Sequence, residues 1–208
     1  MERRHSMTAE RTSTRTRAGE NYLTEQEEKR LFRHLKGLKS RQAERDYVLL
    51  KLCRLTGLRR AEALALNVGD VINQKRIIID ERIARKGAVG EVGIPVELQK
   101  IIKRFLWLKR TWRESLDDEA PLFVSKRGNR LSLRAFNDLM DKWCRSAGIP
   151  RYTPHALRHT KAHRILEKSD NPPKALVYVN NQLRHKSYNS TLVYTLPTKE
   201  EREKVAGL

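Results

Sequence analysis

Three short clusters rich in arginine and histidine, together with one tyrosine, carry the side chains that could do chemistry in this sequence. The clusters are TGLRRAE (56–62), HALRHT (155–160) and LRHKS (183–187), and Tyr194 follows His185 by nine positions. Taken singly, each cluster is more typical of a solvated helix face than of a site. In combination they supply the arginine, histidine and tyrosine side chains that a covalent phosphoryl transfer needs.

The combination suits the exchange of a phosphodiester bond. Charge develops on the non-bridging phosphate oxygens, and two guanidinium groups can hold those oxygens bidentately at any working pH. A tyrosine phenol can attack phosphorus and form a phosphotyrosine. Its reference pKa of about 10 requires a nearby base, and histidine has the reference pKa nearest that task. A lysine or a histidine can then protonate the leaving 5′-alkoxide.

The same residues bear on the question of cofactors. The sequence contains no cluster of carboxylates that would bind Mg²⁺ and no Cys/His spacing that would bind zinc. The protein would therefore have to neutralise the phosphate charge with its own cations. We expect a reaction that uses no metal ion, no ATP and no other cofactor.

The composition indicates a polyanionic partner. The 208 residues contain 44 Lys and Arg against 25 Asp and Glu, which gives a formal net charge of +19. A domain this basic usually binds DNA or RNA. An anionic membrane surface is the competing explanation, and it is disfavoured because no long basic helix with an aromatic face is evident.

Length, cysteine use and hydropathy place the chain in a broad class. Its length fits one domain, or one domain with a tail, and a chain of this size can bury a core without disulfides. Cys53 and Cys144 lie in apolar, helical stretches and are predicted to be reduced core residues. No apolar run approaches the ~20 residues that a membrane helix needs. We expect a cytoplasmic protein associated with the nucleoid.

The pattern of apolar residues predicts a mainly helical domain that begins near residue 21. Residues 1–20 contain five arginines and almost no large apolar residues, and we interpret them as a flexible basic arm. Thr24 and Glu27 form the pattern of a capping box, which would open a helix running toward residue 39. Further helices are predicted at about 42–56, which Gly57 would end, and at 60–66.

The middle of the chain changes character, and the remainder returns to helix. The β-branched residues at 76–80 predict a strand, and 81–86 and 91–96 predict two more around a turn at 87–90. The fold class is therefore mainly α with a small antiparallel β-sheet (α+β). The helices predicted after the sheet cover about 97–115, 132–147, 154–168, 172–184, 188–194 and 198–206.

The order and spacing of the motifs resemble those of the tyrosine recombinase, or phage integrase, family. The shared pattern is TGLR-x-x-E, then HxLRHT, then a histidine nine residues before a tyrosine, and it spans roughly residues 22–200. The resemblance implies the tyrosine recombinase catalytic-domain fold over residues 21–208. It also implies site-specific DNA recombination, in which strands are cut and rejoined through a 3′-phosphotyrosine intermediate.

The resemblance implies roles for the two arginines. Arg59 and Arg158 match the family arginines that clamp the scissile phosphate. Glu62 matches an acidic residue that supports the arginine region rather than taking part in the chemistry. The pattern therefore places the first and the second cluster on the same phosphate.

The remaining catalytic positions are also filled. Lys86 matches the β-hairpin lysine that acts as general acid for the leaving 5′-oxygen, and Arg85 is its near neighbour in this register. His155 matches the histidine that assists proton removal from the nucleophile. His185 matches a position that hydrogen-bonds the phosphate. Tyr194 matches the nucleophile, and it is preferred over Tyr188, which follows His185 too closely.

The sequence departs from the family pattern beside His185. The family usually has Leu-Gly-His where this chain has Leu183-Arg184-His185. Arg184 replaces a small residue at a tight helix approach, so it either alters the local geometry or adds a phosphate contact. Lys161 stands where many members carry phenylalanine.

The N-terminal region is a larger departure. Many family members carry a separate helical core-binding domain, and the two domains together form a clamp around DNA. Here about 20 residues precede the predicted catalytic domain, so we expect a naturally short recombinase or a truncated chain, without a separate core-binding domain. Its positive charge would partly compensate, and phosphate contacts would make DNA binding strongly salt-dependent.

The resemblance implies double-stranded DNA as the partner, with a homo-tetramer assembled on paired DNA sites. An accessory DNA-binding protein is a further possible partner. Three alternatives stay open: a type IB topoisomerase-like enzyme that relaxes supercoils, a non-catalytic DNA-binding module, and a basic RNA-binding protein. The last is disfavoured because the sequence lacks an aromatic platform on which bases could stack.

Overall fold

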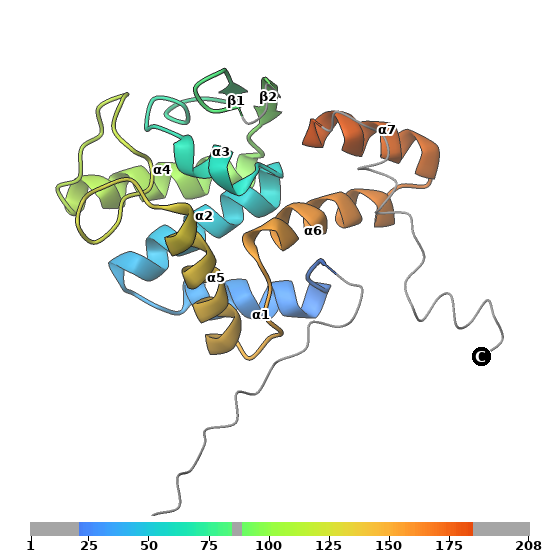
Figure 1. The fold of residues 1–208 in the computed structure, drawn as a ribbon, viewed down its shortest axis with the longest axis horizontal. Helices are drawn as coiled ribbons and strands as arrows, with labels where there is room; N and C mark the ends of the chain where they lie inside the picture. Colours follow the sequence, from blue (N-terminus) through green and yellow to red (C-terminus); the bar gives the residue numbers. More distant parts are fainter. Residues whose placement is uncertain (1–20, 85–88, 185–208) are drawn as a thin grey trace, which may run out of the picture.

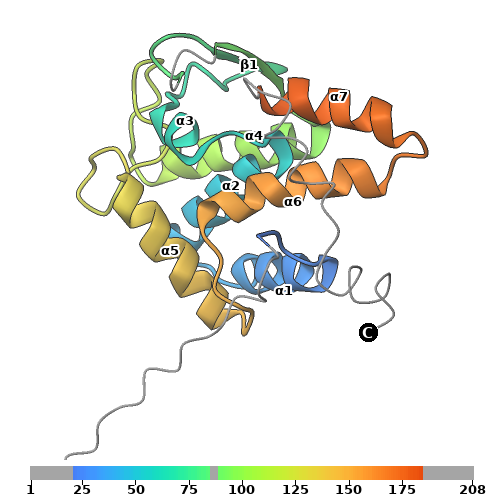
Figure 2. The ribbon, with the colours of Figure 1, turned by 45° about the vertical axis from the view of Figure 1, so that its right-hand side comes forward.

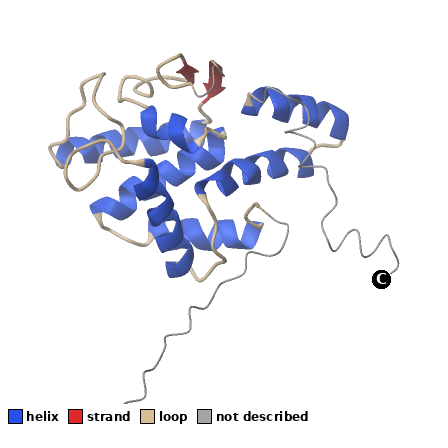
Figure 3. Cartoon of the chain, viewed as in Figure 1, coloured by secondary structure: helices blue, strands red, loops and turns tan. Residues whose placement is uncertain are grey.

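The computed structural model describes residues 21–84 and 89–184, and this part of the chain consists of seven helices and one small sheet (Figure 1). The predicted fold class, mainly α with a small antiparallel sheet, is confirmed (Figure 3). The helices are α1 (Glu25–Lys36), α2 (Arg41–Thr56), α3 (Arg60–Ala65), α4 (Val96–Thr111), α5 (Leu133–Ser146), α6 (Pro154–Glu167) and α7 (Pro172–Leu183), and the strands are β1 (Arg76–Ile79) and β2 (Gly90–Gly93).

Several predicted features lie outside the described residues. These are the basic arm at 1–20, residues 85–86 of the predicted strand, residues 87–88 of the predicted turn, and the helices predicted at 188–194 and 198–206. They stay predictions.

The first helices begin and end where local chemistry indicates. Thr24 and Glu27 form the predicted capping box, in which the Glu27 backbone N–H donates to Thr24 Oγ1 at 3.3 Å and the Thr24 N–H donates to Glu27 Oε2 at 2.8 Å. Helix α1 ends at Lys36, three residues before the predicted end near residue 39, and Gly37 is its C-cap. Gly57 ends α2 in the left-handed conformation, with φ 75°.

Helix α2 is the centre of the domain. It packs against α1, α4 and α6, which surround it in Figures 1 and 2. Its buried residues come from several sides of the helix and include Leu49, Leu50, Leu52 and Cys53. A helix that is apolar on several sides is typical of a core position. The end of α2 is therefore a fixed point from which Gly57 leads into α3.

The sheet and α7 lie together on one side of this core. Helix α7 packs on α6, and β2 lies beside the C-terminal end of α7 in both views (Figures 1 and 2). The strands are antiparallel, with Ile77 opposite Val92. Ile77 and Val92 are both buried, so one face of the sheet covers the core.

The third predicted strand, at 81–86, is wrong for residues 81–84, which form a turn. The Asp80 carbonyl accepts hydrogen bonds from the backbone N–H groups of Ile83 (3.2 Å) and Ala84 (2.7 Å), and Asp80 Oδ1 also accepts from Ile83 (3.1 Å). Arg82 is held at the same time by the Asp70 carboxylate, at 2.6 and 2.8 Å. These contacts satisfy the backbone locally, so it does not need a strand partner.

Helix α4 ends at Thr111, earlier than the predicted end at residue 115. Trp112 caps the helix, and Arg113 then adopts the left-handed conformation with φ 57°, which cannot continue a right-handed helix. Lys109 is fully buried in the last turn, where its Nζ pairs with Glu114 Oε2 at 2.6 Å. This ion pair fixes the segment that leaves the helix.

Both cysteines are buried free thiols, as predicted. Burial raises the pKa of the Cys144 thiol to about 11, so it stays protonated and unreactive at neutral pH. Within residues 21–84 and 89–184, no helix combines the length and the apolar character needed to cross a membrane.

Candidate active site

The HALRHT motif occupies the first turns of α6. Thr153 precedes the helix and Pro154 takes its first position, where a missing N–H costs nothing. The three- and four-residue spacings then place Arg158 and His159 on the same side of the helix as His155. The helix start therefore sets the direction of all three side chains.

Thr160 of the same motif has a structural role. Its Oγ1 accepts a hydrogen bond from the Leu23 backbone N–H at 2.9 Å and donates one to the Ala156 carbonyl at 2.8 Å. Thr160 and Leu23 are both fully buried. This contact ties the first described residues to α6, and it therefore holds the helix that carries His155 and Arg158.

Arg158 joins three parts of the fold. Its side chain is buried, with 2% of the residue surface exposed. Nη1 donates to the Gly57 carbonyl at 2.5 Å, and Nη2 donates to the Leu183 carbonyl. One guanidinium on α6 therefore connects the end of α2 with the end of α7.

Gly57 and Leu183 also touch each other. A Cβ atom on Gly57 would lie 2.5 Å from Leu183 Cδ2, closer than real Cβ contacts come. With its φ of 75°, this position therefore requires glycine on two grounds. The glycine lets α7 end directly against the start of the TGLRRAE segment.

Arg59 lies beside Arg158 because it binds the next carbonyl of the same helix end. Its Nη2 donates to the Arg184 carbonyl at 3.1 Å, while Arg158 binds the preceding carbonyl. Nη1 of Arg59 donates to Glu62 Oε1 and its backbone N–H donates to Glu62 Oε2, both at 2.8 Å. The Arg59 side chain keeps 28% of its surface exposed, so it faces solvent from this fixed position.

Glu62 is the buried counter-ion of the site, with none of its surface exposed. It accepts from Arg59 on both oxygens, and its Oε2 also pairs with Arg184 Nη2 at 2.6 Å. Burial acts to raise the pKa of Glu62. The charge of Arg184 and the hydrogen bonds from Arg59 outweigh it, and the pKa lies below its ordinary value. Glu62 is therefore ionised at neutral pH and orients two guanidiniums.

Arg184 is the C-cap of α7 and adopts the left-handed conformation, with φ 51°. The departure from the family glycine therefore preserves a backbone conformation that glycine favours. The stem of Arg184 also lies against β2, because a Cβ atom on Gly90 would approach Arg184 Cδ to 3.0 Å. Arg184 links the end of α7 to α3 through Glu62, and to the sheet through Gly90.

His155 lies at the exposed edge of this cluster. The protein around its ring partly removes it from water, and the positive charges of Arg158, Arg59 and Arg60 also oppose protonation, so the pKa of His155 is lowered. The His159 ring lies edge-on to it, with 4.4 Å between the ring centroids. A neutral imidazole at pH 7 can accept a proton, as a general base must.

This electrostatic setting predicts the titration of His155 in the DNA-free protein. Its midpoint should lie below the ordinary histidine value of 6.5, because partial burial disfavours the charged ring and protonation adds a charge beside three arginines. Histidine Cε1–H NMR signals followed against pH would measure it, with the urea-unfolded chain as the reference. Arg60→Ala, which removes an exposed cation, should move the midpoint upward. A midpoint at or above the unfolded value would contradict the expectation.

The structure thus brings together Arg59, Arg158 and His155 of the six predicted catalytic residues. The other three, Lys86, His185 and Tyr194, lie outside the described residues. Arg184, which directly precedes His185, is described, and so is Gly90, four residues after Lys86. The side chain of Arg184 lies against Gly90. Within the described ranges, no group of three His, Cys, Asp or Glu side chains is placed to hold a metal ion.

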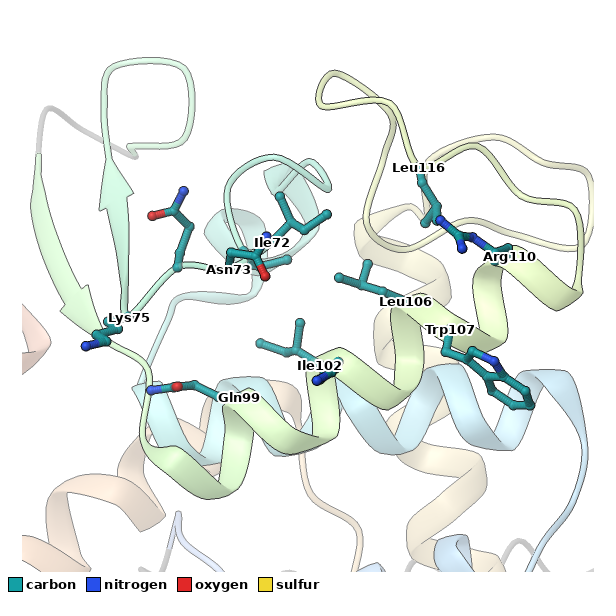
Figure 4. Close-up of a pocket in the computed structure, with 12 residues that line it drawn as sticks. Ile72, Asn73, Lys75, Gln99, Ile102, Leu106, Trp107, Arg110 and Leu116 are labelled. Atoms are coloured by element: carbon teal, nitrogen blue, oxygen red, sulfur yellow. The ribbon is translucent and has the colours of Figure 1, made fainter.

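A separate hollow of about 530 Å³ lies between α4 and the segment at 71–75 (Figure 4). Lys75, Leu106, Trp107 and Arg110 are among its lining residues. The described residues that line it include none of the predicted catalytic residues. The arginine cluster, and not this hollow, is therefore the candidate active site.

Two contacts of the site were not anticipated from the sequence. The first is the ion pair between Arg184 and Glu62, which joins residues 122 positions apart. The departure of Arg184 from the family glycine was the available signal. The second is the packing of His159 on His155, which their four-residue spacing on one helix could have indicated.

The fold is that of tyrosine recombinase catalytic domains. A solved XerA recombinase superposes with a TM-score of 0.70 and 26% identity, over 89% of this chain and 62% of that one. A XerH site-specific recombinase, solved in a post-cleavage complex with a palindromic difH substrate, gives a TM-score of 0.67. It is 21% identical, over 91% of this chain and 53% of that one.

The chain belongs to the phage integrase family, whose model matches residues 21–201. The tyrosine recombinase XerC of Shewanella amazonensis is 35% identical over 154 residues, which are 74% of this chain and 49% of XerC. The chain spans about half the length of the curated relatives it matches.

Proposed function

We propose that this chain is the catalytic domain of a site-specific tyrosine recombinase, which cuts and rejoins double-stranded DNA through a covalent bond to Tyr194. The proposal depends mainly on one observation: two guanidinium groups donate hydrogen bonds to the backbone carbonyls of two successive residues. Arg158 binds the Leu183 carbonyl and Arg59 binds the Arg184 carbonyl, directly before His185. Two arginines fixed side by side suit the two non-bridging oxygens of one phosphate.

In the proposed cleavage step, the Tyr194 oxygen forms a bond to phosphorus and the bond from phosphorus to the 5′-oxygen breaks. Arg59 and Arg158 hold the non-bridging oxygens and stabilise their developing charge. His155, whose lowered pKa keeps it neutral, assists removal of the phenol proton. Lys86 donates a proton to the leaving 5′-oxygen, and His185 hydrogen-bonds the phosphate.

Rejoining reverses these roles. A 5′-hydroxyl from a partner duplex gives up its proton and attacks the phosphotyrosine, the bond from phosphorus to the Tyr194 oxygen breaks, and the released phenolate takes up a proton. One phosphoester is exchanged for another, so the cycle needs no ATP. The arginines supply the positive charge, so we propose that the reaction also needs no metal ion.

The proposed partner is double-stranded DNA, with four protomers on two paired sites. The formal net charge of +19 supports binding to a polyanion. The structurally similar Tn1549 transposon integrase was solved in complex with transposon right end DNA, which supports DNA over RNA as the partner. An accessory DNA-binding protein is proposed only as a possible further partner.

Covalent trapping would test the proposal. The protein would be incubated with supercoiled plasmid in EDTA, and the products would be run on a denaturing gel to detect protein-linked DNA. Wild type should give a covalent adduct, and Tyr194→Phe should give none because it lacks the attacking oxygen. Tyr188→Phe is the matched control and should behave as wild type. An adduct formed by Tyr194→Phe would overturn the nucleophile assignment.

The same assay separates recombination from a topoisomerase-like activity. A recombinase joins different DNA segments, so a mixture of two marked plasmids should yield hybrid products. Relaxation of supercoils without any hybrid product would favour the type IB topoisomerase-like alternative.

A further inference from the structure

Arg184 is a largely buried arginine with N–H groups that make no hydrogen bond in the described part of the chain. Its side chain is 8% exposed. Its Nε and Nη1 atoms are buried and have no hydrogen-bond partner in the described part of the chain. The remaining nitrogen, Nη2, pairs with Glu62 at 2.6 Å. A buried guanidinium with open donors is unfavourable unless another group completes it.

The backbone at this position also favours a different residue. Arg184 has φ 51° and ψ 51°, in the left-handed region, where a Cβ atom costs free energy and glycine does not. Glycine would therefore form this helix end with less strain. An arginine in a strained backbone conformation, with N–H groups that lack an acceptor, indicates a functional role for the side chain.

The charges around it point to an anion. In the described residues, the cluster consists of three guanidiniums, from Arg59, Arg158 and Arg184, around the one carboxylate of Glu62. Arg158 binds neutral carbonyls at Gly57 and Leu183. Arg59 and Arg184 share the one carboxylate of Glu62, so these three paired side chains carry a net positive charge. A phosphate diester carries the negative charge and the acceptor oxygens that this cluster lacks.

We propose that Arg184 is a third phosphate-binding arginine of this site. Glu62 holds Nη2, and the free N–H groups on Nε and Nη1 donate to a non-bridging oxygen of the DNA backbone. The inference rests on the proposed function, because it places the DNA phosphate beside Arg59 and Arg158. Glu62 then has two tasks: it neutralises part of the cluster and it sets the spacing between Arg59 and Arg184.

Arg184→Gly tests this role with a residue that suits the left-handed backbone conformation at this position. Binding of the full chain to a short fluorescein-labelled duplex would be followed by anisotropy over a range of KCl concentrations. Loss of one phosphate contact should reduce the slope of log K against log salt by about 0.9. Covalent adduct formation should also fall about tenfold or more, because a charged hydrogen bond is lost.

Arg113→Gly is the matched control. Arg113 is exposed and also has a positive φ, 57°, so the substitution removes the same charge and relieves the same kind of strain. Its position at the end of α4 is remote from the end of α7 (Figure 1). The control should keep the wild-type salt slope. Equal slopes for Arg184→Gly, Arg113→Gly and wild type would overturn the phosphate contact.

The readouts separate this inference from the proposed function. If wild type forms a covalent adduct and Arg184→Gly keeps the wild-type slope, the third arginine is wrong and the recombinase proposal stands. If the slope falls in Arg184→Gly but wild type never forms an adduct, the phosphate contact stands and the catalytic proposal fails.

Discussion

Arg158→Ala is expected to lower covalent DNA cleavage by about a thousandfold or more. Arg158 is buried, and its position is set by two carbonyls at the ends of α2 and α7. A side chain held so firmly is organised before DNA binds, which is the condition for stabilising charge in a transition state. Single-turnover adduct formation measures the loss. DNA affinity should fall much less, because in the proposed complex many other cations would also contact the duplex.

The effect on folding has to be separated from the effect on chemistry. Arg158→Ala leaves the Gly57 and Leu183 carbonyls without this donor, and each buried orphan costs about 1–3 kcal/mol. Arg158→Lys keeps a positive charge and a single donor nitrogen, so its free energy of unfolding in urea should lie between those of wild type and Arg158→Ala. It should nevertheless lose most of the cleavage, because lysine cannot bind phosphate bidentately.

Arg164→Ala is the control on the same helix. Arg164 follows Arg158 by six residues, and it pairs with Glu167 Oε2 at 2.5 Å and donates to the Leu23 carbonyl at 3.3 Å. Its removal should leave cleavage near the wild-type rate. Wild-type cleavage by Arg158→Ala would contradict the clamp role for the second arginine.

The parts of this fold that could be predicted are the parts fixed by local chemistry. Thr24 and Glu27 are three residues apart and form the capping box that their types indicate. Gly57 ends α2 because glycine alone takes the left-handed conformation cheaply. The strand predicted at 81–86 is wrong for residues 81–84, because contacts with residues elsewhere in the fold decide their conformation. A contact between Arg82 and Asp70, together with the turn at Asp80, overrides the strand propensity of the segment.

The sequence motifs predicted which residues form the site, but they did not predict the contacts that those residues make. Motif order selected Arg59 and Arg158, but the carbonyls that fix them come from residues 125 and 101 positions away, respectively. Such pairings depend on how α2, α6 and α7 pack, which periodicity does not reveal. The double role of Glu62 depends on Arg184, the residue at which the sequence departs from the family pattern. The structure was needed to join these two observations.

Glu62→Ala is expected to destabilise the fold by about 3–5 kcal/mol. The carboxylate is fully buried and binds Arg59 and Arg184, so its removal leaves both guanidiniums without a counter-ion in the described cluster. The Arg59 backbone N–H at the start of α3 also loses its acceptor. Urea unfolding measures the loss. Glu62→Gln, which keeps the volume and one acceptor oxygen, should lose less.

The pH dependence of unfolding provides an independent check on this ion pair. The pKa of Glu62 is lowered in the folded protein, so its contribution is fully present above the ordinary carboxylate value of 4.5. It is lost as the pH falls through the folded pKa, because protonation removes the charge that Arg59 and Arg184 bind. The difference in unfolding free energy between wild type and Glu62→Gln should therefore shrink as the pH is lowered below 4.5.

A double substitution shows whether the unpaired guanidinium of Arg184 causes the loss of stability in Glu62→Ala. Arg184→Gly removes one of the two charges that Glu62→Ala strands and relieves the strained backbone at φ 51°. The pair Glu62→Ala/Arg184→Gly should therefore be more stable than Glu62→Ala alone, with a coupling free energy of about 1 kcal/mol or more. Strict additivity of the two changes would mean that Glu62 and Arg184 do not stabilise each other. Glu62 would then act through Arg59 alone.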